Sequence, residues 1–175
     1  MIRSFRAIVV SAAMGALALV LPVAFHAVGL GSKFLPMLLP LLLNGFLVPV
    51  PWAVGTGLII PWISALATGM PPLYPPVAAV LGLEAAIMGA VASLLYVRWR
   101  RSVWMALLPA VIAGRLVSFA AVWLLAGLFA LPPAFTATAS ILQGLPGVAL
   151  QVTVIPLVVE MLRRRPGLLF SDHRE

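Results

Sequence analysis

Apolar stretches of about 20 residues recur along nearly the whole chain, and a stretch of that length crosses a bilayer as an α-helix. The chain is 63% hydrophobic, whereas a soluble domain is roughly half apolar. Few residues remain outside the apolar stretches, so no separate soluble domain is expected. The sequence therefore predicts an all-α integral membrane protein that is embedded in a lipid bilayer.

Six membrane-spanning helices fit this pattern. The second and third are short for a hydrocarbon core of about 30 Å. Pro36, Pro40 and Pro61 interrupt them, which predicts irregular backbone. We expect one six-helix transmembrane domain over residues 1–165 and a short tail over 166–175. The expected spans are Phe5–Val28, Phe34–Val48, Ala53–Thr68, Val77–Val97, Val103–Phe129 and Phe135–Leu162.

Arginines at the ends of the spans set the expected orientation. They precede the first span, separate the fourth from the fifth, and follow the sixth, so six spans place all of them on one side. The positive-inside rule makes that side cytoplasmic. Both termini are then cytoplasmic, the protein is multi-pass, and the segment "TGMPPLYPP" (Thr68–Pro76) lies outside. The arginines are Arg3, Arg6, Arg98, Arg100, Arg101 and Arg163–Arg165.

The first span could be mistaken for a signal peptide, because two arginines precede an apolar stretch. That stretch is too long for an ordinary signal core, and no clear A-x-A cleavage site follows it. We interpret it as a retained first helix. The net charge of +7 does not indicate nucleic-acid binding, because membrane topology accounts for the arginines.

The sequence lacks the residues that disulfides, thiolate metal sites and several common catalytic or nucleotide-binding motifs require. The chain has no cysteine, so it offers neither a disulfide framework nor a thiolate metal site. It contains no G-x-x-x-x-G-K-[ST], H-E-x-x-H or G-x-S-x-G motif. We therefore expect no ATP hydrolysis by this chain, no enzyme activity, no metal and no cofactor.

A few polar side chains fall inside the apolar spans, where a charge costs about 3 kcal/mol or more and usually marks function. Glu84 and Arg115 could both face a ligand, or they could form a structural ion pair. His26 could contact the ligand or lie at the membrane interface, and Asn44 could bond a neighbouring helix instead. Tyr74 belongs to the outer segment. Gln143 and Gln151 could likewise bond neighbouring helices. The candidate substrate-binding residues are Glu84, Arg115, Asn44, Trp62, Tyr74, Gln143 and His26.

Small residues four positions apart allow helices to approach closely. Ala12 and Ala16 form such a pair in the first span, and Gly82, Ala86 and Ala90 form a longer row in the fourth. Each set could serve packing within the bundle or docking of another membrane subunit.

Several segments together resemble a known family. "LATGMPPLYPP", "GLEAAIMGAVASLLY", "AGRLVS" and "LPGVALQVTVIPLV" follow in the order found in substrate-binding S components of energy-coupling factor (ECF) vitamin transporters. The resemblance covers about residues 8–160. It implies that residues 1–165 form a substrate-binding six-helix bundle in a bacterial cytoplasmic (inner) membrane. Both termini are then inside, and the substrate site lies near the outer face. The implied partners are a vitamin-like small molecule, a shared transmembrane coupling subunit and two cytoplasmic ATPases.

The resemblance also assigns roles to matched positions. Ala12 and Ala16 match the small-residue motif that contacts the coupling subunit, and Thr68–Pro76 matches an outer loop near the substrate pocket. Within the family the chain looks similar to members assigned to small heteroaromatic vitamin precursors, such as hydroxymethylpyrimidine, and to many members of unassigned substrate. They commonly read Met-His-Ile-Pro where this chain has Met37-Leu38-Leu39-Pro40, so a polar group is missing here and a more apolar ligand is indicated.

Three functions follow from the residues and the resemblance. The first is capture of a small vitamin-like molecule at the outer face for ATP-driven uptake, with hydrolysis by the partners. The second is a self-sufficient secondary transporter with Glu84 as its proton site. The third is a structural or assembly subunit of a membrane complex, whose polar groups only fix the helices.

Overall fold

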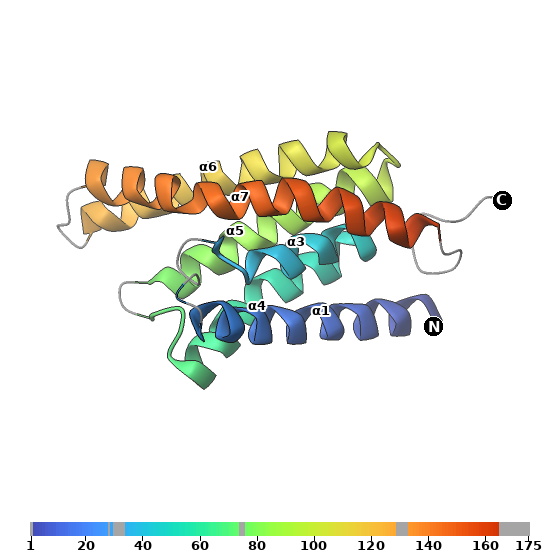
Figure 1. Ribbon diagram of the computed structural model, residues 1–175, viewed down its shortest axis with the longest axis horizontal. Coiled ribbons are helices and arrows are strands. Elements are labelled where there is room, and N and C mark those ends of the chain that lie inside the picture. The colour runs from blue at the N-terminus through green and yellow to red at the C-terminus, as the bar shows by residue number, and fades with distance from the viewer. Residues whose placement is uncertain (1, 28, 30–33, 74–75, 129–132, 165–175) are drawn as a thin grey trace.

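The computed structural model describes residues 2–27, 29, 34–73, 76–128 and 133–164. All the regular structure in this part of the chain is helical. The helices match the six expected spans to within a few residues, apart from the short second one. They are α1 (Ile2–Ala27), α3 (Leu38–Leu47), α4 (Val50–Thr68), α5 (Val77–Ala92), the π-helical η1 (Ser93–Arg98), α6 (Val103–Leu128) and α7 (Pro133–Arg163) (Figure 1).

Five helical segments are long and apolar enough to cross a membrane: those of α1, α4, α6 and α7, and the continuous helix that α5 forms with η1. The exception is α3, whose 10 residues extend only about 15 Å. It is followed by extended backbone at Val48 and Pro49, after which α4 begins. A bilayer-spanning role for this part of the chain therefore depends on α3 together with its flanking segments.

The prolines affect the helices less than expected. Pro40 lies in the first turn of α3, where a proline removes no helical hydrogen bond. Pro61 lies inside α4, which continues through it. The prediction of irregular backbone was confirmed at Pro36, which lies in a turn before α3, and was wrong at Pro40 and Pro61. Close packing of α4 on α5 supports the helix there, because Gly57, one turn before Pro61, lies directly against the backbone of Ala86.

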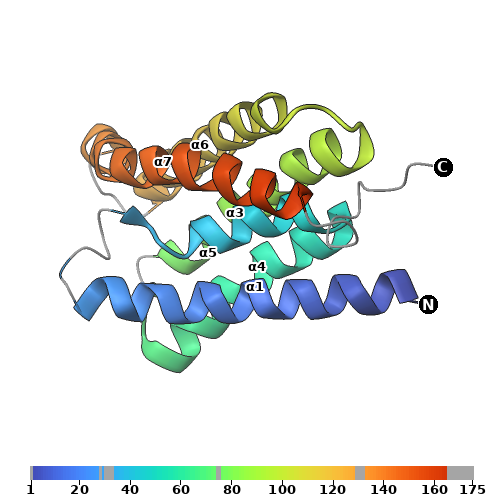
Figure 2. The same ribbon diagram turned by 45° about the vertical axis from the view of Figure 1, so that its right-hand side comes forward.

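The helices form three layers, which two views of the bundle show (Figures 1 and 2). α6 and α7 lie on one side, α1 and α4 on the other, and α5 and α3 between them. α5 packs against α3, α4 and α6. Its contact with α4 is close because Gly82 and Gly89 face Leu58 and Ala53. Gly82 and Ala86, which lies against Gly57 of α4, therefore serve packing within the bundle, as two members of the predicted row of small residues.

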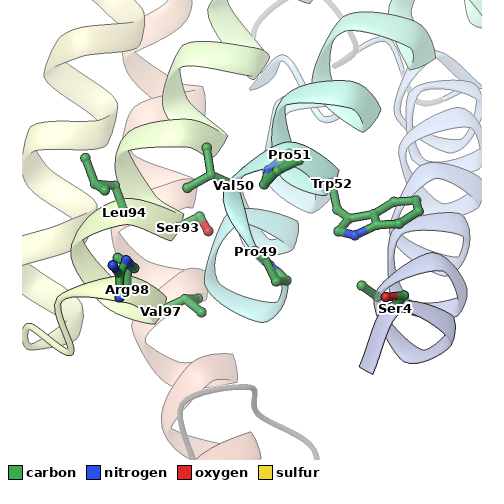
Figure 3. Close-up of a pocket in the computed structure, with 10 residues that line it drawn as sticks. Ser4, Pro49, Val50, Pro51, Trp52, Ser93, Leu94, Val97 and Arg98 are labelled. Atoms are coloured by element: carbon green, nitrogen blue, oxygen red, sulfur yellow. The ribbon is translucent and has the colours of Figure 1, made fainter. Parts of the chain in front are cut away.

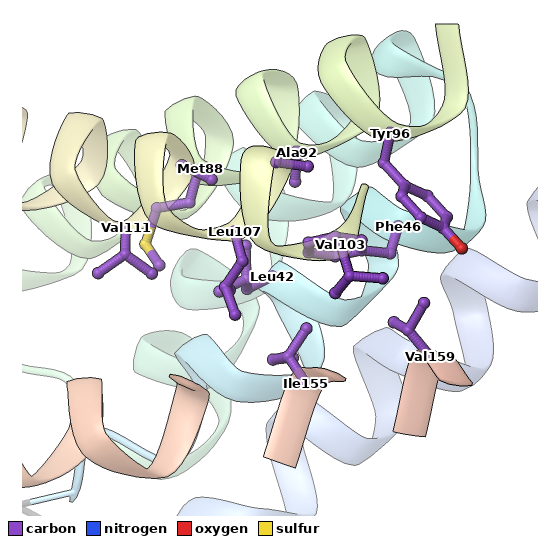
Figure 4. Packing of buried hydrophobic residues seen from close by; sticks show 12 residues of the cluster. Leu42, Phe46, Met88, Ala92, Tyr96, Val103, Leu107, Val111, Ile155 and Val159 are labelled. Atoms are coloured by element: carbon purple, nitrogen blue, oxygen red, sulfur yellow. The ribbon is translucent and has the colours of Figure 1, made fainter. Parts of the chain in front are cut away.

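The largest apolar cluster joins α3, α5, η1, α6 and α7 (Figure 4). Phe46 and Tyr96 stack at a tilt with their ring centroids 5.2 Å apart. The cluster reaches the end of the bundle where α6 begins and α7 ends. Its buried residues are Leu42, Phe46, Met88, Ala92, Tyr96, Val103, Ala106, Leu107, Ala110, Val111, Ile155 and Val159.

α1 begins and α7 ends at the same end of the bundle (Figure 1). We call this the arginine-rich end, because the arginines at the described helix ends gather there. The ends of α1, α4 and α6 lie at the opposite end. The arginines concerned are Arg6, Arg98, Arg100, Arg101, Arg163 and Arg164.

Candidate functional site

Glu84 and Arg115 form an ion pair between α5 and α6. The Glu84 side chain is 1% exposed and the Arg115 side chain 20% exposed. Ser118, about one turn after Arg115 on α6, donates a hydrogen bond to the same carboxylate. Glu84 lies seven residues into α5, or about 10 Å from the start of that helix. The pair is thus enclosed by apolar helices, in the half of the bundle away from the arginine-rich end.

Glycines make room for this pair. A Cβ atom at Gly114 would overlap the Met88 side chain and lie 3.4 Å from Cγ of Glu84. A Cβ atom at Gly144 would lie 2.6 Å from Nη1 of Arg115. The guanidinium group therefore reaches across to α7, so three helices surround it. Nε of Arg115 is buried without a hydrogen-bond partner in the described structure.

α7 directs one row of residues into the bundle. Gly144, Gly147, Gln151, Ile155 and Val159 are all buried and are three or four positions apart. Gln151 is 1% exposed, and neither its amide nitrogen nor its amide oxygen has a hydrogen-bond partner within the described residues. It was not among the residues predicted to bind substrate. Gln151 lies seven residues after Gly144 and therefore on the face of α7 that meets Arg115. The sequence does not reveal that this face points inward, because apolar residues occur on every side of α7.

The other predicted residues lie elsewhere or outside the description. Asn44 is buried and forms hydrogen bonds of 3.3 and 3.4 Å with the Ser11 side chain, which joins α3 to α1. Trp62 is 45% exposed on α4. Tyr74 lies outside the described residues, as do the side chains of His26 and Gln143. The structure therefore brings together Glu84 and Arg115, but not Trp62.

The sequence matches the family profile of the ECF transporter, substrate-specific component, over residues 6–159. The chain belongs to this family. No curated protein and no solved structure matches the chain significantly. This family consists of substrate-binding subunits of transporters and is not an enzyme family. Its members associate with other components of the ECF complex, and the apolar helices agree with a multi-pass membrane protein.

In this substrate-specific component, the segment predicted to lie outside (Thr68–Pro76) begins where α4 ends. Gly69 ends α4 with left-handed backbone (φ 74°), a conformation that suits glycine. The Ser64 hydroxyl donates a 2.7 Å hydrogen bond to the carbonyl of Met70, which ties the segment back to α4. Met70 and Leu73 are about half exposed. In both ribbon views the end of α4 lies on the far side of α1 from α7 (Figures 1 and 2).

The two alanines of α1 face away from the bundle. Ala12 and Ala16 are exposed, whereas Ser11, Gly15 and Ala18 are buried against the neighbouring helices. A Cβ atom at Gly15 would lie 2.8 Å from Ile60 of α4, so the buried face of α1 is closely packed. The small residues at positions 12 and 16 therefore do not contribute to packing within this subunit.

A cavity of about 510 Å³ lies at the arginine-rich end (Figure 3). Its walls come from the start of α1, the α3–α4 turn and η1, and most of them are apolar. Trp52 extends toward α1, and Arg98 lines the side formed by η1. Neither Glu84 nor Arg115 lines this cavity, so it is distinct from the buried ion pair.

Proposed function

We propose that this subunit captures a small vitamin or vitamin precursor at the outer face of the membrane for ATP-driven uptake by an ECF-type importer. Membership of the family supports a substrate-binding role. The observation that carries the proposal is the enclosed Glu84–Arg115 pair, whose guanidinium group retains an unpartnered Nε. Buried polar groups without partners are costly, and a polar ligand can satisfy them.

The proposed orientation has the arginine-rich end in the cytoplasm. The described arginines at helix ends gather there, which is the distribution that the positive-inside rule associates with a cytoplasmic face. Both termini then lie on the cytoplasmic side of a bacterial cytoplasmic membrane, and Met70–Leu73 lies on the outer side. The ion pair lies nearer the outer side in this orientation, so a substrate arriving from outside has the shorter path to it.

The substrate site centres on Glu84 and Arg115. Arg115 supplies a buried donor, and the carboxylate holds the guanidinium group in place. Tyr74, His26 and Gln143 remain further candidates for this site. Asn44 and Trp62 remain candidates as well. To contact the substrate, Asn44 would have to break its hydrogen bonds with Ser11, and the exposed face of α4 that carries Trp62 would have to turn toward the bundle interior.

The coupling surface is the exposed face of α1 around Ala12 and Ala16. Small side chains there allow a helix of the transmembrane coupling subunit to approach closely. This chain has no P-loop, so two cytoplasmic ATPase subunits would supply the energy through that coupling subunit.

Native mass spectrometry of the protein, purified gently in mild detergent, tests substrate capture. We expect a retained molecule of vitamin size. Uptake of that molecule is then measured in proteoliposomes with and without the coupling subunit and the ATPases. Uptake only with the ATPases supports the proposal, and uptake by this chain alone favours a secondary transporter. A protein that retains no molecule and supports no uptake in either preparation contradicts the proposal and favours a structural subunit.

A further inference from the structure

We propose that Gln151 is a substrate contact and that the substrate is an uncharged molecule with a hydrogen-bond donor and acceptor side by side, as in an amide or a lactam. This inference rests on the proposed substrate capture and specifies the chemistry of the same site. Its starting point is the fully buried Gln151 amide, which has no partner within the described structure.

Gln151 is the exception among the buried polar residues described. Ser11 and Asn44 bond each other, Ser64 bonds the Met70 carbonyl, and Ser93 bonds the Val48 carbonyl at 2.7 Å. Glu84 is paired with Arg115. The other fully buried polar side chains described therefore have partners within the chain, whereas Gln151 has none at either amide atom and the partly exposed Arg115 keeps an unpartnered Nε. Side-chain atoms left unpartnered in this way call for a group from outside the chain.

The position of Gln151 connects it to the ion pair. Gly144, which contacts Arg115, precedes it by seven residues on the same face of α7, a separation of about 10 Å along the axis. Ile155 and Val159, one and two turns beyond, belong to the apolar cluster (Figure 4). Gln151 therefore lies where the inward face of α7 changes from small and polar to apolar. A molecule spanning Arg115 and Gln151 would have the size of a ring with a short substituent.

The amide side chain defines the complementary group. It offers two N–H donors and one carbonyl acceptor. An amide or lactam edge presents an acceptor to the N–H and a donor to the oxygen, so both atoms are satisfied at once. A site that forms such bonds rejects analogues that lack the groups, because its own buried atoms are then left unpaired.

The charges near the site favour a neutral substrate. Glu84 and Arg115 are the ionisable residues that lie well inside the described helices, and they neutralise each other. The other described salt bridge, between Glu160 and Arg163, lies at the arginine-rich end. An anionic substrate, such as a phosphate ester or a carboxylate, would bring an uncompensated charge into this environment, which is strongly unfavourable.

The test uses two matched pairs of probes: uracil with its 6-carboxylate, orotate, and nicotinamide with nicotinate. Each pair shares a ring and differs in charge. Binding to the purified full-length protein, freed of retained molecules by extensive exchange in mild detergent, is measured by isothermal calorimetry and by the shift in melting temperature. We expect at least one neutral probe to bind at least tenfold more tightly than its anion. Equal or tighter binding of the anions, or no binding of either neutral probe, overturns the assignment.

Gln151→Leu tests the residue itself. We expect an unchanged or higher melting temperature without probe, because an unpartnered amide is replaced by an apolar group of similar size. The affinity for the neutral probe should fall at least tenfold. Gln151→Glu keeps the size but removes the N–H donors, and it should also lose the probe. Thr153→Val is the control, since Thr153 is exposed and bonds the Ala149 carbonyl of its own helix at 2.8 Å.

A lower melting temperature of Gln151→Leu with unchanged probe affinity would show that the amide only joins helices, and it would overturn the proposal. The proposed function and the inference about Gln151 are tested by different measurements, so one can be contradicted without the other. ATPase-dependent uptake of the molecule retained by the wild-type protein, together with failure of the neutral probes, contradicts only the inference about Gln151 and neutrality.

Discussion

The Glu84 carboxylate and the Arg115 guanidinium group meet between α5 and α6, 31 positions apart in sequence, where the carboxylate is almost inaccessible to solvent. Each charge alone would be costly in this environment, so each depends on the other. Gly114 and Gly144 leave the space that brings them together. The pair therefore holds α5, α6 and α7 in a defined arrangement and also presents a buried donor to a ligand.

Glu84→Gln should destabilise the protein by about 3–5 kcal/mol, because it strands the Arg115 charge. The measurement is the melting temperature in detergent, which we expect to fall by roughly 10 °C. Glu160→Gln is the control, since it breaks an exposed 3.3 Å pair with Arg163, which contributes only about 0–1 kcal/mol. Replacing both members of the buried pair by methionine should recover most of the stability and still abolish substrate binding. A Glu84→Gln protein as stable as the control would show that the buried pair does not hold the helices.

Ala12→Leu and Ala16→Leu should leave the melting temperature and substrate binding unchanged, because both positions are exposed. Uptake and co-purification with the coupling subunit should be lost, since larger side chains keep a partner helix at a distance. Ala120→Leu, at an exposed position on α6, is the matched control and should retain the partner. Normal co-purification and transport by both α1 variants would exclude this face as the coupling surface.

Gly57→Ala should destabilise the bundle by about 1–3 kcal/mol through overpacking. The added Cβ would lie 2.7–2.8 Å from backbone atoms of Ala85 and Ala86, which cannot move aside as a flexible side chain could. Gly55→Ala, two residues earlier on α4, meets no atom within 4 Å and should be neutral or slightly stabilising. Thermal unfolding of the two variants compares them directly. Equal stability would contradict the close α4–α5 contact.

The orientation can be tested by cysteine labelling, because the chain has no native cysteine. A membrane-impermeant maleimide added to intact cells should label Leu73→Cys and should label Ser102→Cys only after the membrane is opened. Both positions are exposed, so labelling reports the side of the membrane rather than burial. The reverse pattern would place the arginine-rich end outside.

The sequence predicted the helical spans to within a few residues, apart from the short α3, because the length and hydropathy of a membrane helix are local properties. The family resemblance was confirmed over residues 6–159. The sequence also marked Glu84 and Arg115, since ionisable residues are conspicuous among apolar ones. The positions of the prolines were visible as well, but their effect was not, because packing against a neighbouring helix decides whether a helix continues through a proline.

Tertiary structure decided which residues face one another. In a soluble helix the apolar face identifies the interior, but here lipid and protein interior are equally apolar, so hydropathy does not distinguish the two faces. That is why the sequence did not show that Trp62 is half exposed, that Ala12 and Ala16 point outward, or that Gln151 points inward. It also did not show that Ser11 would bond Asn44. The sequence determined how long each helix is, apart from α3, and which polar groups it carries. The packing of small residues, above all glycines, decided which of those groups meet.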